Sequence, residues 1–426
     1  MRNYRKINLH SNFKNIKIKF PFSKSYTARA LICASLSKGV SKIINPSNSY
    51  DTQLLIRGLR QFGVKIINKK NYLFIRGIFV DKKLLRERKV YIGNAGTSFR
   101  FLTVFASLQK CKTILYGDKH LNKRPIQNLV NSLIESGLKI YSTNGFAPIV
   151  VEGGNFLGGK IKLDSSKSSQ FLSALLLCSP YAQKNTIVIL NRKIPSYSYV
   201  KITIDIMKKF GVDVKTQNEN KFFLTNSKKY NTTVFQNETD ISSVNYFLLA
   251  SAITEKKIKF YYSDINLKTL QSDIKFLFLL KKMGAKIFYT KKYFYIVCEK
   301  LKGISIDMND FPDSVPTLVI ASLFANGITK IKNISHLVYK ETNRLVALKN
   351  ELTKIGAKVK LTKSSITILP QQIYSGAKIN TYDDHRIAMS FAIAGLKIRG
   401  MEIENPNCVN KSFPNFWKEF RKLEED

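Results

Sequence analysis

One short pattern recurs along the chain at intervals of 72 to 74 residues: an amphipathic segment ends in a glycine, and alternating apolar and polar residues follow. The copies are "LRQFGVKI", "IESGLKI", "MKKFGVDV", "LKKMGAKI" and "LTKIGAKV", with glycines at Gly63, Gly137, Gly211, Gly284 and Gly356. Glycine adopts the left-handed backbone that ends a helix at little steric cost, so each copy predicts a helix followed by a strand. A period of this length is typical of stacked or duplicated units.

Apolar runs rich in small residues recur in phase with these glycines. The six runs are "ALICASL", "FLTVFASL", "FLSALLL", "YFLLASA", "LVIASLF" and "AMSFAIAG". They are apolar on every face and predict buried helices, whereas the glycine-ended helices have one polar face and are expected to lie outside them. Each unit is therefore expected to run strand, buried helix, strand, outer helix and two further strands.

The last repeat lacks its final glycine and two strands at the C-terminal end of the sequence. The sixth outer segment, "FPNFWKEFRKLEED", reaches residue 426 before a glycine and two strands can follow. We expect residues 5–20 to supply the missing strands. This places residues 1–20 and 235–426 in one discontinuous lobe and residues 21–234 in an inserted lobe, with three repeats in each lobe and a double hinge between them.

Chain length, hydrophobic content and net charge limit the possible classes of protein and of binding partner. With 426 residues, 44% of them hydrophobic, the chain can form a large core shared among two or three domains. Its 70 Lys and Arg residues against 29 Asp and Glu residues give a net charge of +41. Such a charge suggests nucleic acid, an anionic membrane or small anionic substrates as partners. Lysine is spread along the whole chain, however, and a general compositional bias is the stronger alternative.

Cysteine spacing and the N-terminal segment indicate the compartment. The five cysteines, Cys33, Cys111, Cys178, Cys298 and Cys408, are far apart and form no C-x-x-C pair, which argues against a disulfide framework and against a zinc site. The basic N-terminus lacks the apolar core of a signal peptide, and no apolar run reaches membrane-spanning length. We therefore expect a cytoplasmic protein that does not associate with membranes.

Polar clusters precede the expected helices, where unpaired N–H groups and the positive end of the helix dipole favour anions. Simple N-capping explains the Ser, Thr, Asp and Asn residues of clusters such as "SSKSSQ" and "GNAGTS". It does not explain the cations, which oppose the dipole at this end: Lys24, Arg29, Arg100, Arg124, Lys340, Arg344, Arg386 and Lys411. If "YKETNR" is helical, Lys340 and Arg344 share one face and repel each other. We expect bound anions to offset these cations.

Few carboxylates accompany these cations, and Asp313 is the most prominent of them. It follows Pro312 at the start of an apolar run, and spacing alone supports a helix cap and a general base equally. A salt-bridge partner is the common role for Asp313, Glu341, Asp383 and Asp384 in such surroundings. His385 is interpreted as a structural residue, and no spacing of His and carboxylates predicts a metal site.

Eight motifs, in order and along essentially the whole chain, resemble the 5-enolpyruvylshikimate-3-phosphate synthase family of 3-phosphoshikimate 1-carboxyvinyltransferases. They are "SKSYTARAL", "GNAGTSFRFL", "KRPI", "SSQFLSALLL", "FPDS", "YKETNRL", "YDDHRIAMSF" and "CVNKSFPNF". The resemblance implies two similar α/β lobes, each an inside-out α/β barrel of three βαβαββ repeats, with the active site in the cleft between them. It also implies transfer of the enolpyruvyl group of phosphoenolpyruvate to the 5-hydroxyl of shikimate 3-phosphate, with release of phosphate, in the shikimate pathway to chorismate and aromatic amino acids. No cofactor or metal is implied.

The resemblance also assigns site residues. It implies catalytic roles for Asp313, which would take the 5-hydroxyl proton, and for Glu341 with Lys24, which would deliver a proton to the methylene carbon. For shikimate 3-phosphate it implies Lys24, Ser25, Arg29, Ser168, Ser169, Gln170, Ser196, Tyr199, Asp313 and Lys340. For phosphoenolpyruvate it implies Lys24, Gly96, Arg124, Gln170, Arg344, Arg386 and Lys411.

Some positions depart from the family pattern and bear on substrate affinity and glyphosate sensitivity. They are Phe22 before "SKS", Phe101 in place of a proline, His120 in place of an arginine, His336 in place of an asparagine and Asn343 in place of the aspartate of "KETDR".

Two rival functions remain. The related UDP-N-acetylglucosamine enolpyruvyl transferase carries a loop cysteine, which "GDKHLNKRPI" lacks. An RNA-binding or RNA-cyclase-like relative would need aromatic stacking platforms, whereas the Phe and Tyr residues here follow core periodicity. We therefore expect a monomer whose partners are its two small substrates, without specific nucleic-acid binding.

Overall fold

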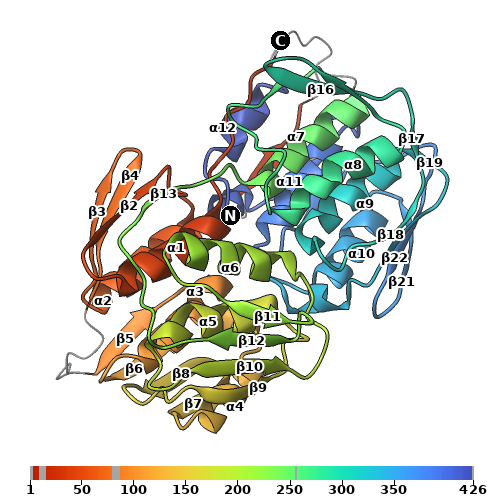
Figure 1. Cartoon of the computed structure of the whole chain (residues 1–426). Coiled ribbons are helices and arrows are strands. Elements are labelled where there is room, and N and C mark those ends of the chain that lie inside the picture. Colours follow the sequence, from red (N-terminus) through yellow and green to blue (C-terminus); the bar gives the residue numbers. More distant parts are fainter. Residues whose placement is uncertain (1–2, 9–15, 79–86, 255–256, 425–426) are drawn as a thin grey trace. The chain divides into compact units, whose positions relative to one another are not determined.

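The computed structural model describes residues 3–8, 16–78, 87–254 and 257–424, and it shows a mixed α/β fold (Figure 1). The chain divides into two compact units. Unit 1 comprises Met1–Pro21 and Thr239–Asp426, and unit 2 comprises Phe22–Glu238.

Unit 2 is built from four-stranded sheets and pairs of helices. One sheet has the order β13 (Val234–Gln236), β2 (Val40–Ile44), β4 (Tyr72–Arg76), β3 (Lys65–Lys69). The next has the order β5 (Arg88–Tyr91), β6 (Lys112–Tyr116), β8 (Phe146–Glu152), β7 (Lys139–Thr143). The third has the order β11 (Lys215–Gln217), β12 (Lys221–Leu224), β10 (Thr186–Leu190), β9 (Gly159–Leu163). Its helices are α1 (Lys24–Leu36), α2 (Tyr50–Gln61), α3 (Gly96–Ser107), α4 (Gln127–Glu135), α5 (Ser169–Cys178) and α6 (Ser198–Lys209), with short 3-10 helices η1 (Leu121–Lys123) and η2 (Ser179–Tyr181).

The second of these sheets shows the connection that the sequence pattern predicts. Strands β5 and β6 pair in parallel, and the buried helix α3 connects them. Helix α4 then leads into β7, which forms an antiparallel hairpin with β8, and β8 pairs antiparallel with β6. Parallel neighbours need such a crossover, and the face of the sheet that receives it must be apolar.

Unit 1 contains related sheets of more varied size. A four-stranded sheet has the order β18 (Ser305–Asp307), β20 (Thr329–Lys332), β22 (Ile366–Leu369), β21 (Lys358–Leu361). Two three-stranded sheets have the orders β14 (Phe260–Tyr261), β16 (Tyr293–Val297), β15 (Lys286–Tyr289) and β1 (Tyr4–Lys6), β24 (Glu402–Glu404), β23 (Lys378–Ile379). A two-stranded sheet pairs β17 (Leu301–Lys302) with β19 (Ala325–Asn326). Its helices are α7 (Ile241–Thr254), α8 (Lys275–Lys282), α9 (Val315–Leu323), α10 (Arg344–Lys354), α11 (His385–Ala394) and α12 (Phe416–Arg421), with 3-10 helices η3 (Ser272–Ile274), η4 (Pro312–Ser314), η5 (Ser335–Tyr339) and η6 (Pro406–Lys411). Strand β1 pairs antiparallel with β24, with Arg5 opposite Ile403, so early and late parts of the chain share one sheet.

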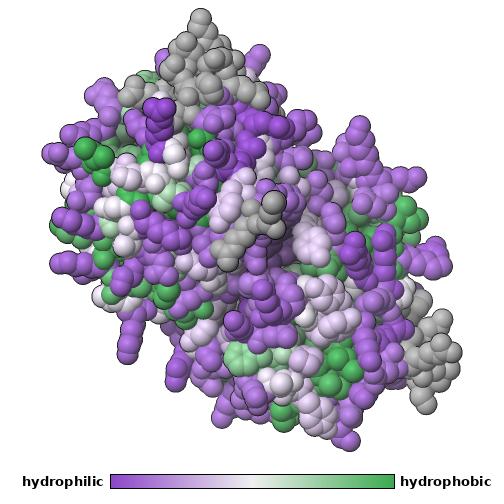
Figure 2. Space-filling model, turned by 180° about the vertical axis from the view of Figure 1, so that it is seen from behind, coloured by the Kyte–Doolittle hydropathy of each residue, from purple (hydrophilic) through white to green (hydrophobic). Residues whose placement is uncertain are grey.

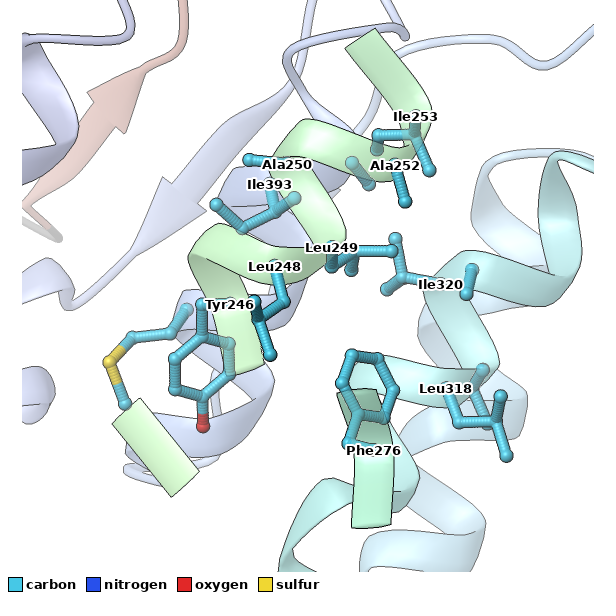
Figure 3. Packing of buried hydrophobic residues seen from close by; sticks show 14 of the residues in the cluster. Tyr246, Leu248, Leu249, Ala250, Ala252, Ile253, Phe276, Leu318, Ile320 and Ile393 are labelled. Atoms are coloured by element: carbon cyan, nitrogen blue, oxygen red, sulfur yellow. The ribbon is translucent and has the colours of Figure 1, made fainter. Parts of the chain in front are cut away.

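The six apolar runs lie in α1, α3, α5, α7, α9 and α11, and their burial confirms that prediction. In unit 1, α7, α9 and α11 contact one another. Figure 3 shows Leu249 of α7 pointing toward Ile320 of α9, while Ile393 of α11 lies beside α7. Each fully buried side chain of this kind contributes about 1.5–3 kcal/mol to folding. The cores therefore hold the N-termini of the buried helices in fixed places.

The repeated glycines end the outer helices as predicted. Gly63, Gly137, Gly211, Gly284 and Gly356 all have positive φ, between 83° and 106°. Hydrophilic side chains cover most of the face shown in Figure 2. Within the described ranges, no helix has the length and apolar character required to cross a membrane.

Candidate functional site

A network of buried ion pairs lies in unit 1 where α9, α10 and α11 begin. Arg344, the first residue of α10, is 1% exposed and contacts carboxylates from different elements. Its Nε donates to Asp384 at 2.7 Å, its Nη2 to Glu341 at 2.6 Å and its Nη1 to Asp313 at 3.0 Å. Burial alone would lower the pKa of Arg344, but these carboxylates raise it above its usual value. Arg344 is therefore held permanently charged.

Arg386 completes the network from the first turn of α11. Its Nη2 donates to the second oxygen of Asp313 at 2.6 Å, and its Nη1 donates to the buried hydroxyl of Tyr246 at 3.4 Å. Lys340 Nζ lies 3.7 Å from Asp313 Oδ1. Asp313 thus faces three cations from two segments of the chain.

The structure decides between the interpretations of Asp313. The residue lies in η4, and α9 begins after Ser314 without a side-chain cap hydrogen bond, so the helix-cap interpretation is wrong. Burial would raise the pKa of Asp313, but Arg386, Lys340 and Arg344 outweigh it and hold that pKa well below its usual range. Asp313 is therefore an ionised salt-bridge partner, and in these surroundings a weak base.

In unit 1, protein carboxylates pair with Arg344 and Arg386, so these cations are offset at least in part by the chain itself. Lys340 also lies outside the helix, because α10 begins at Arg344 and Asn343 caps it by accepting a bond from Val346 N–H. The two cations of "YKETNR" therefore do not share a helical face.

The turn that presents Asp384 is strained. Tyr382 and Asp383 both have positive φ, 53° and 57°, which non-glycine residues seldom adopt. Asp384 then caps α11, accepting the Arg386 N–H at 2.8 Å while it also binds the Arg344 side chain. One fully buried carboxylate thus fixes the starts of two helices.

His336 lies close to this network and is neutral. It is buried in η5, and burial, with further contributions from Lys340 and Arg344, lowers its pKa to about 3. At neutral pH it therefore adds no positive charge beside Lys340.

A polar group next to Asp313 was not predicted from the sequence. Asp273 of η3 is 3% exposed and accepts a hydrogen bond from Ser314 Oγ at 2.6 Å. Asn245 of α7 donates to Ser314 Oγ at 2.9 Å. Asp273 stands in "LQSDIKF" just before an outer helix, the position that drew attention to the other clusters, and that position could have identified it.

In unit 2, Gly96 lies against two guanidinium groups. A Cβ atom on Gly96 would fall 2.4 Å from Arg124 Cζ and 2.4 Å from Arg100 Nη1. Arg100 is buried, donates to the Pro125 carbonyl at 2.9 Å and lies near the rings of Phe99 and Phe171. Arg124 donates to the Asn94 carbonyl at 3.3 Å. The predicted residues Gly96 and Arg124 are therefore neighbours, and "GNAGTS" supplies no side-chain cap for α3.

Lys24 and Arg29 of α1 have different surroundings. Lys24 Nζ pairs with Asp51 Oδ2 at 2.9 Å. Arg29 is buried and donates to Thr203 Oγ1 at 2.7 Å, to the Ser25 carbonyl at 2.9 Å and to the Tyr199 carbonyl at 3.2 Å. Burial lowers the pKa of Arg29 to about 10. The predicted residues Ser25, Arg29 and Tyr199 therefore lie together, and the Arg29 guanidinium binds protein atoms.

The remaining predicted residues of unit 2 lie at α5 and before α6. Ser168 caps α5 by accepting the Gln170 N–H at 3.2 Å, which confirms the capping interpretation of "SSKSSQ". Ser169 is buried, and within the described residues the buried Gln170 Oε1 has no hydrogen-bond donor. Ser196 has a φ of 56°, a strained backbone of the kind found at functional sites. In unit 1, Lys411 ends η6, which packs against α11.

Comparisons with known proteins agree along the length of the chain. A family model described as EPSP synthase (3-phosphoshikimate 1-carboxyvinyltransferase) matches residues 14–420. The 3-phosphoshikimate 1-carboxyvinyltransferase of Buchnera aphidicola subsp. Cinara cedri is 40% identical over 413 residues, which cover 96% of this chain and 94% of the relative. The protein of that name from Photobacterium profundum is 34% identical over 416 residues, 96% of this chain and 97% of the relative. A solved structure of EPSP synthase from Acinetobacter baumannii superposes with a TM-score of 0.81 at 27% identity, covering 99% of this chain and 98% of that one.

Proposed function

The chain belongs to the EPSP synthase (3-phosphoshikimate 1-carboxyvinyltransferase) family, and from this premise we propose which of its residues carry the reaction. It transfers the enolpyruvyl group of phosphoenolpyruvate to the 5-hydroxyl of shikimate 3-phosphate and releases phosphate, a step of aromatic amino acid biosynthesis. The observation that carries the residue-level proposal is the Asp313 carboxylate among Lys340, Arg344 and Arg386.

We propose that Arg344, Arg386 and Lys411 of unit 1 and Lys24, Gly96, Arg124 and Gln170 of unit 2 bind phosphoenolpyruvate. Guanidinium groups bind carboxylates and phosphates with paired N–H donors, whereas lysine acts as a point charge. Gly96 would admit the ligand because a side chain there would displace the Arg124 guanidinium. The buried Oε1 of Gln170 supports a ligand contact, since buried polar atoms are seldom left without a partner.

For shikimate 3-phosphate we propose a binding site in which several residues carry hydroxyl groups. It comprises Lys24, Ser25, Arg29, Ser168, Ser169, Gln170, Ser196 and Tyr199 of unit 2 with Asp313 and Lys340 of unit 1. Serine hydroxyls can donate to phosphate oxygens and accept from sugar hydroxyls. Because the Arg29 guanidinium binds the Tyr199 carbonyl, its proposed role includes holding Tyr199 in place.

In the proposed mechanism Asp313 accepts the 5-hydroxyl proton as the oxygen bonds to the carbon that carries the phosphate. Glu341 with Lys24 delivers a proton to the methylene carbon, and loss of that proton with departure of phosphate restores the double bond. Asp313 is a weak base while Arg386, Lys340 and Arg344 lower its pKa. Substrate anions that pair with these cations would raise that pKa, so proton transfer would depend on both substrates being bound.

Four further features belong to the proposal. Each unit forms an inside-out α/β barrel of three βαβαββ repeats, and the chain passes between the units twice, as the division at residues 21/22 and 238/239 supports. The protein acts as a monomer. It works in the cytoplasm, as expected for an enzyme of small anionic metabolites. The +41 charge reflects a general compositional bias, and the protein binds no nucleic acid specifically.

Asp313→Asn tests the proposed base directly. The variant keeps the shape of the side chain but removes its charge, so turnover should fall by ~10²–10⁴, the usual cost of losing a general base. Stability should also fall, by about 1.5–3 kcal/mol, because Arg386 loses a charged hydrogen bond. Asp310→Asn, which removes a neighbouring acid paired with Lys275, is the matched control. Near-normal turnover in folded Asp313→Asn would leave Asp313 with a structural role only.

A further inference from the structure

Asp273 is a buried carboxylate that the proposed mechanism does not use. Burying such a group is costly unless hydrogen bonds and opposite charges compensate it. The Ser314 hydroxyl donates to its Oδ1 at 2.6 Å. The Asn245 amide donates to its backbone carbonyl at 3.0 Å and to Ser314 Oγ at 2.9 Å. Asp273, Ser314 and Asn245 thus form one closed group between η3, η4 and α7.

This group fastens the turn that presents Asp313. Ser314 directly follows Asp313 in η4, so a bond that fixes Ser314 also fixes the backbone from which the Asp313 side chain projects. A second bond ties the same segments together, because Ser272 Oγ donates to the Asp310 carbonyl at 3.0 Å. Hydrogen bonds with η3 therefore hold the backbone of the turn. Ion pairs with Arg386 and Arg344 hold the Asp313 carboxylate.

The charged groups near Asp273 include Arg386, the cation that also pairs with Asp313. The ionisable groups that face it are Asp313 of η4, Arg386 of α11 and Asp240, which precedes α7. Burial, followed by the charge of Asp313, raises the pKa of Asp273 to about 6, whereas Arg386 opposes that rise. The pKa of Asp313 is shifted in the opposite direction. Two acids whose pKa values are driven apart around one cation are typical of acid–base sites.

We propose that Asp273 is a positioning residue for Asp313, holding the η4 turn through its hydrogen bond with Ser314. It touches no substrate. The inference rests on the proposed function, because it assumes that Asp313 accepts the 5-hydroxyl proton. A displaced base loses rate even when substrates bind normally, since a shift of about 1 Å can cost ~10²-fold.

The test compares turnover and Michaelis constants of Ser314→Ala and Asp273→Asn with those of Asp310→Asn. Ser314→Ala removes the bond but keeps the Asp273 carboxyl group, and Asp273→Asn replaces that carboxyl group by an amide of nearly the same shape. We expect each to lower kcat at least about tenfold while both Michaelis constants stay within about twofold of wild type. In an Asp313→Asn background neither change should lower kcat further, because the base that they position is already gone. A general loss of packing would not produce that dependence on Asp313.

The possible results distinguish the positioning role of Asp273 from the proposed general-base role of Asp313. If Asp313→Asn is impaired but Ser314→Ala and Asp273→Asn turn over like Asp310→Asn, the positioning role of Asp273 is wrong and the role of Asp313 stands. If Asp313→Asn itself turns over normally, both ideas fail. Thermal unfolding of each variant shows whether it is folded, and Ser314→Ala keeps the test decisive should Asp273→Asn not fold.

Discussion

Replacing Gly96 by alanine should weaken phosphoenolpyruvate binding by displacing Arg124. The added Cβ would lie 2.4 Å from Arg124 Cζ, 2.5 Å from Arg124 Nη1 and 2.4 Å from Arg100 Nη1. Comfortable separations are about 3.5–4.0 Å, so both guanidinium groups must move, each by roughly 1 Å or more. Gly96 begins α3 without a positive φ, so alanine causes no backbone strain and the effect is one of contact alone.

Arg124 should be displaced further than Arg100. Arg100 is confined between aromatic rings and the Pro125 carbonyl, whereas the Arg124 bond to the Asn94 carbonyl is longer, at 3.3 Å. Losing one charge-assisted contact costs about 1.5–3 kcal/mol, which corresponds to a rise of roughly 10- to 150-fold in the Michaelis constant for phosphoenolpyruvate. The constant for shikimate 3-phosphate should change little.

The assay is initial-rate phosphate release, with phosphoenolpyruvate varied at saturating shikimate 3-phosphate. Arg124→Ala and the double variant complete a cycle: if Gly96→Ala acts through Arg124, the double variant should be no worse than Arg124→Ala alone. Two results would refute the reasoning. One is a wild-type Michaelis constant for phosphoenolpyruvate in Gly96→Ala, and the other is full additivity in the double variant.

Two further predictions concern stability. The pKa of His336 is about 3 in the folded chain and about 6.5 in the unfolded chain, so only the unfolded chain binds the proton between these values and the free energy of unfolding falls as the pH drops through that window. Between pH 7 and 5, urea unfolding should show that wild type loses about 2 kcal/mol more of that free energy than His336→Asn, and equal losses would contradict the assignment. Asp384→Ala removes the cap of α11 and a partner of the buried Arg344, so it should cost about 3–5 kcal/mol, and a shift below about 1 kcal/mol in the same experiment would show that Glu341 and Asp313 suffice.

Periodic features of the fold could be read from the sequence because they depend on local chemistry. Gly63 and its counterparts end helices for a reason that lies in their own backbone, and runs such as "FLSALLL" can only be buried. The structure adds strand pairings between distant segments, such as Arg5 opposite Ile403, whose partners spacing alone does not specify.

The site was predictable as a set of charges but not as a set of contacts. The unusual position of the cations indicated Arg344 and Arg386. Apart from Glu341, which is three residues from Arg344, their carboxylate partners lie 31, 40 and 73 residues away in sequence, and no spacing rule connects such distances. For the same reason the even choice at Asp313 between a helix cap and a general base could not be resolved, since "FPDS" places a carboxylate at the start of a helix in either case. Asp273 was missed because its importance comes from Ser314, a neighbour only in the folded chain.

The departures from the family pattern have local explanations in two cases. Asn343 still caps α10, since an amide oxygen accepts the Val346 N–H as an aspartate would. Phe101 is fully buried in α3, and the Arg29 guanidinium lies 5.4 Å from the centre of its ring, which gives the larger side chain a favourable contact.

Product formation from the two substrates decides whether this chain is an enolpyruvyl transferase acting on shikimate 3-phosphate. Purified protein is incubated with phosphoenolpyruvate and shikimate 3-phosphate, and phosphate release is followed together with the mass of the product. We expect one phosphate released per enolpyruvyl shikimate 3-phosphate formed, with no turnover when either substrate is omitted or when UDP-N-acetylglucosamine replaces shikimate 3-phosphate. Phosphate release that does not require shikimate 3-phosphate, or the absence of its enolpyruvyl ether at saturating substrates, would contradict it.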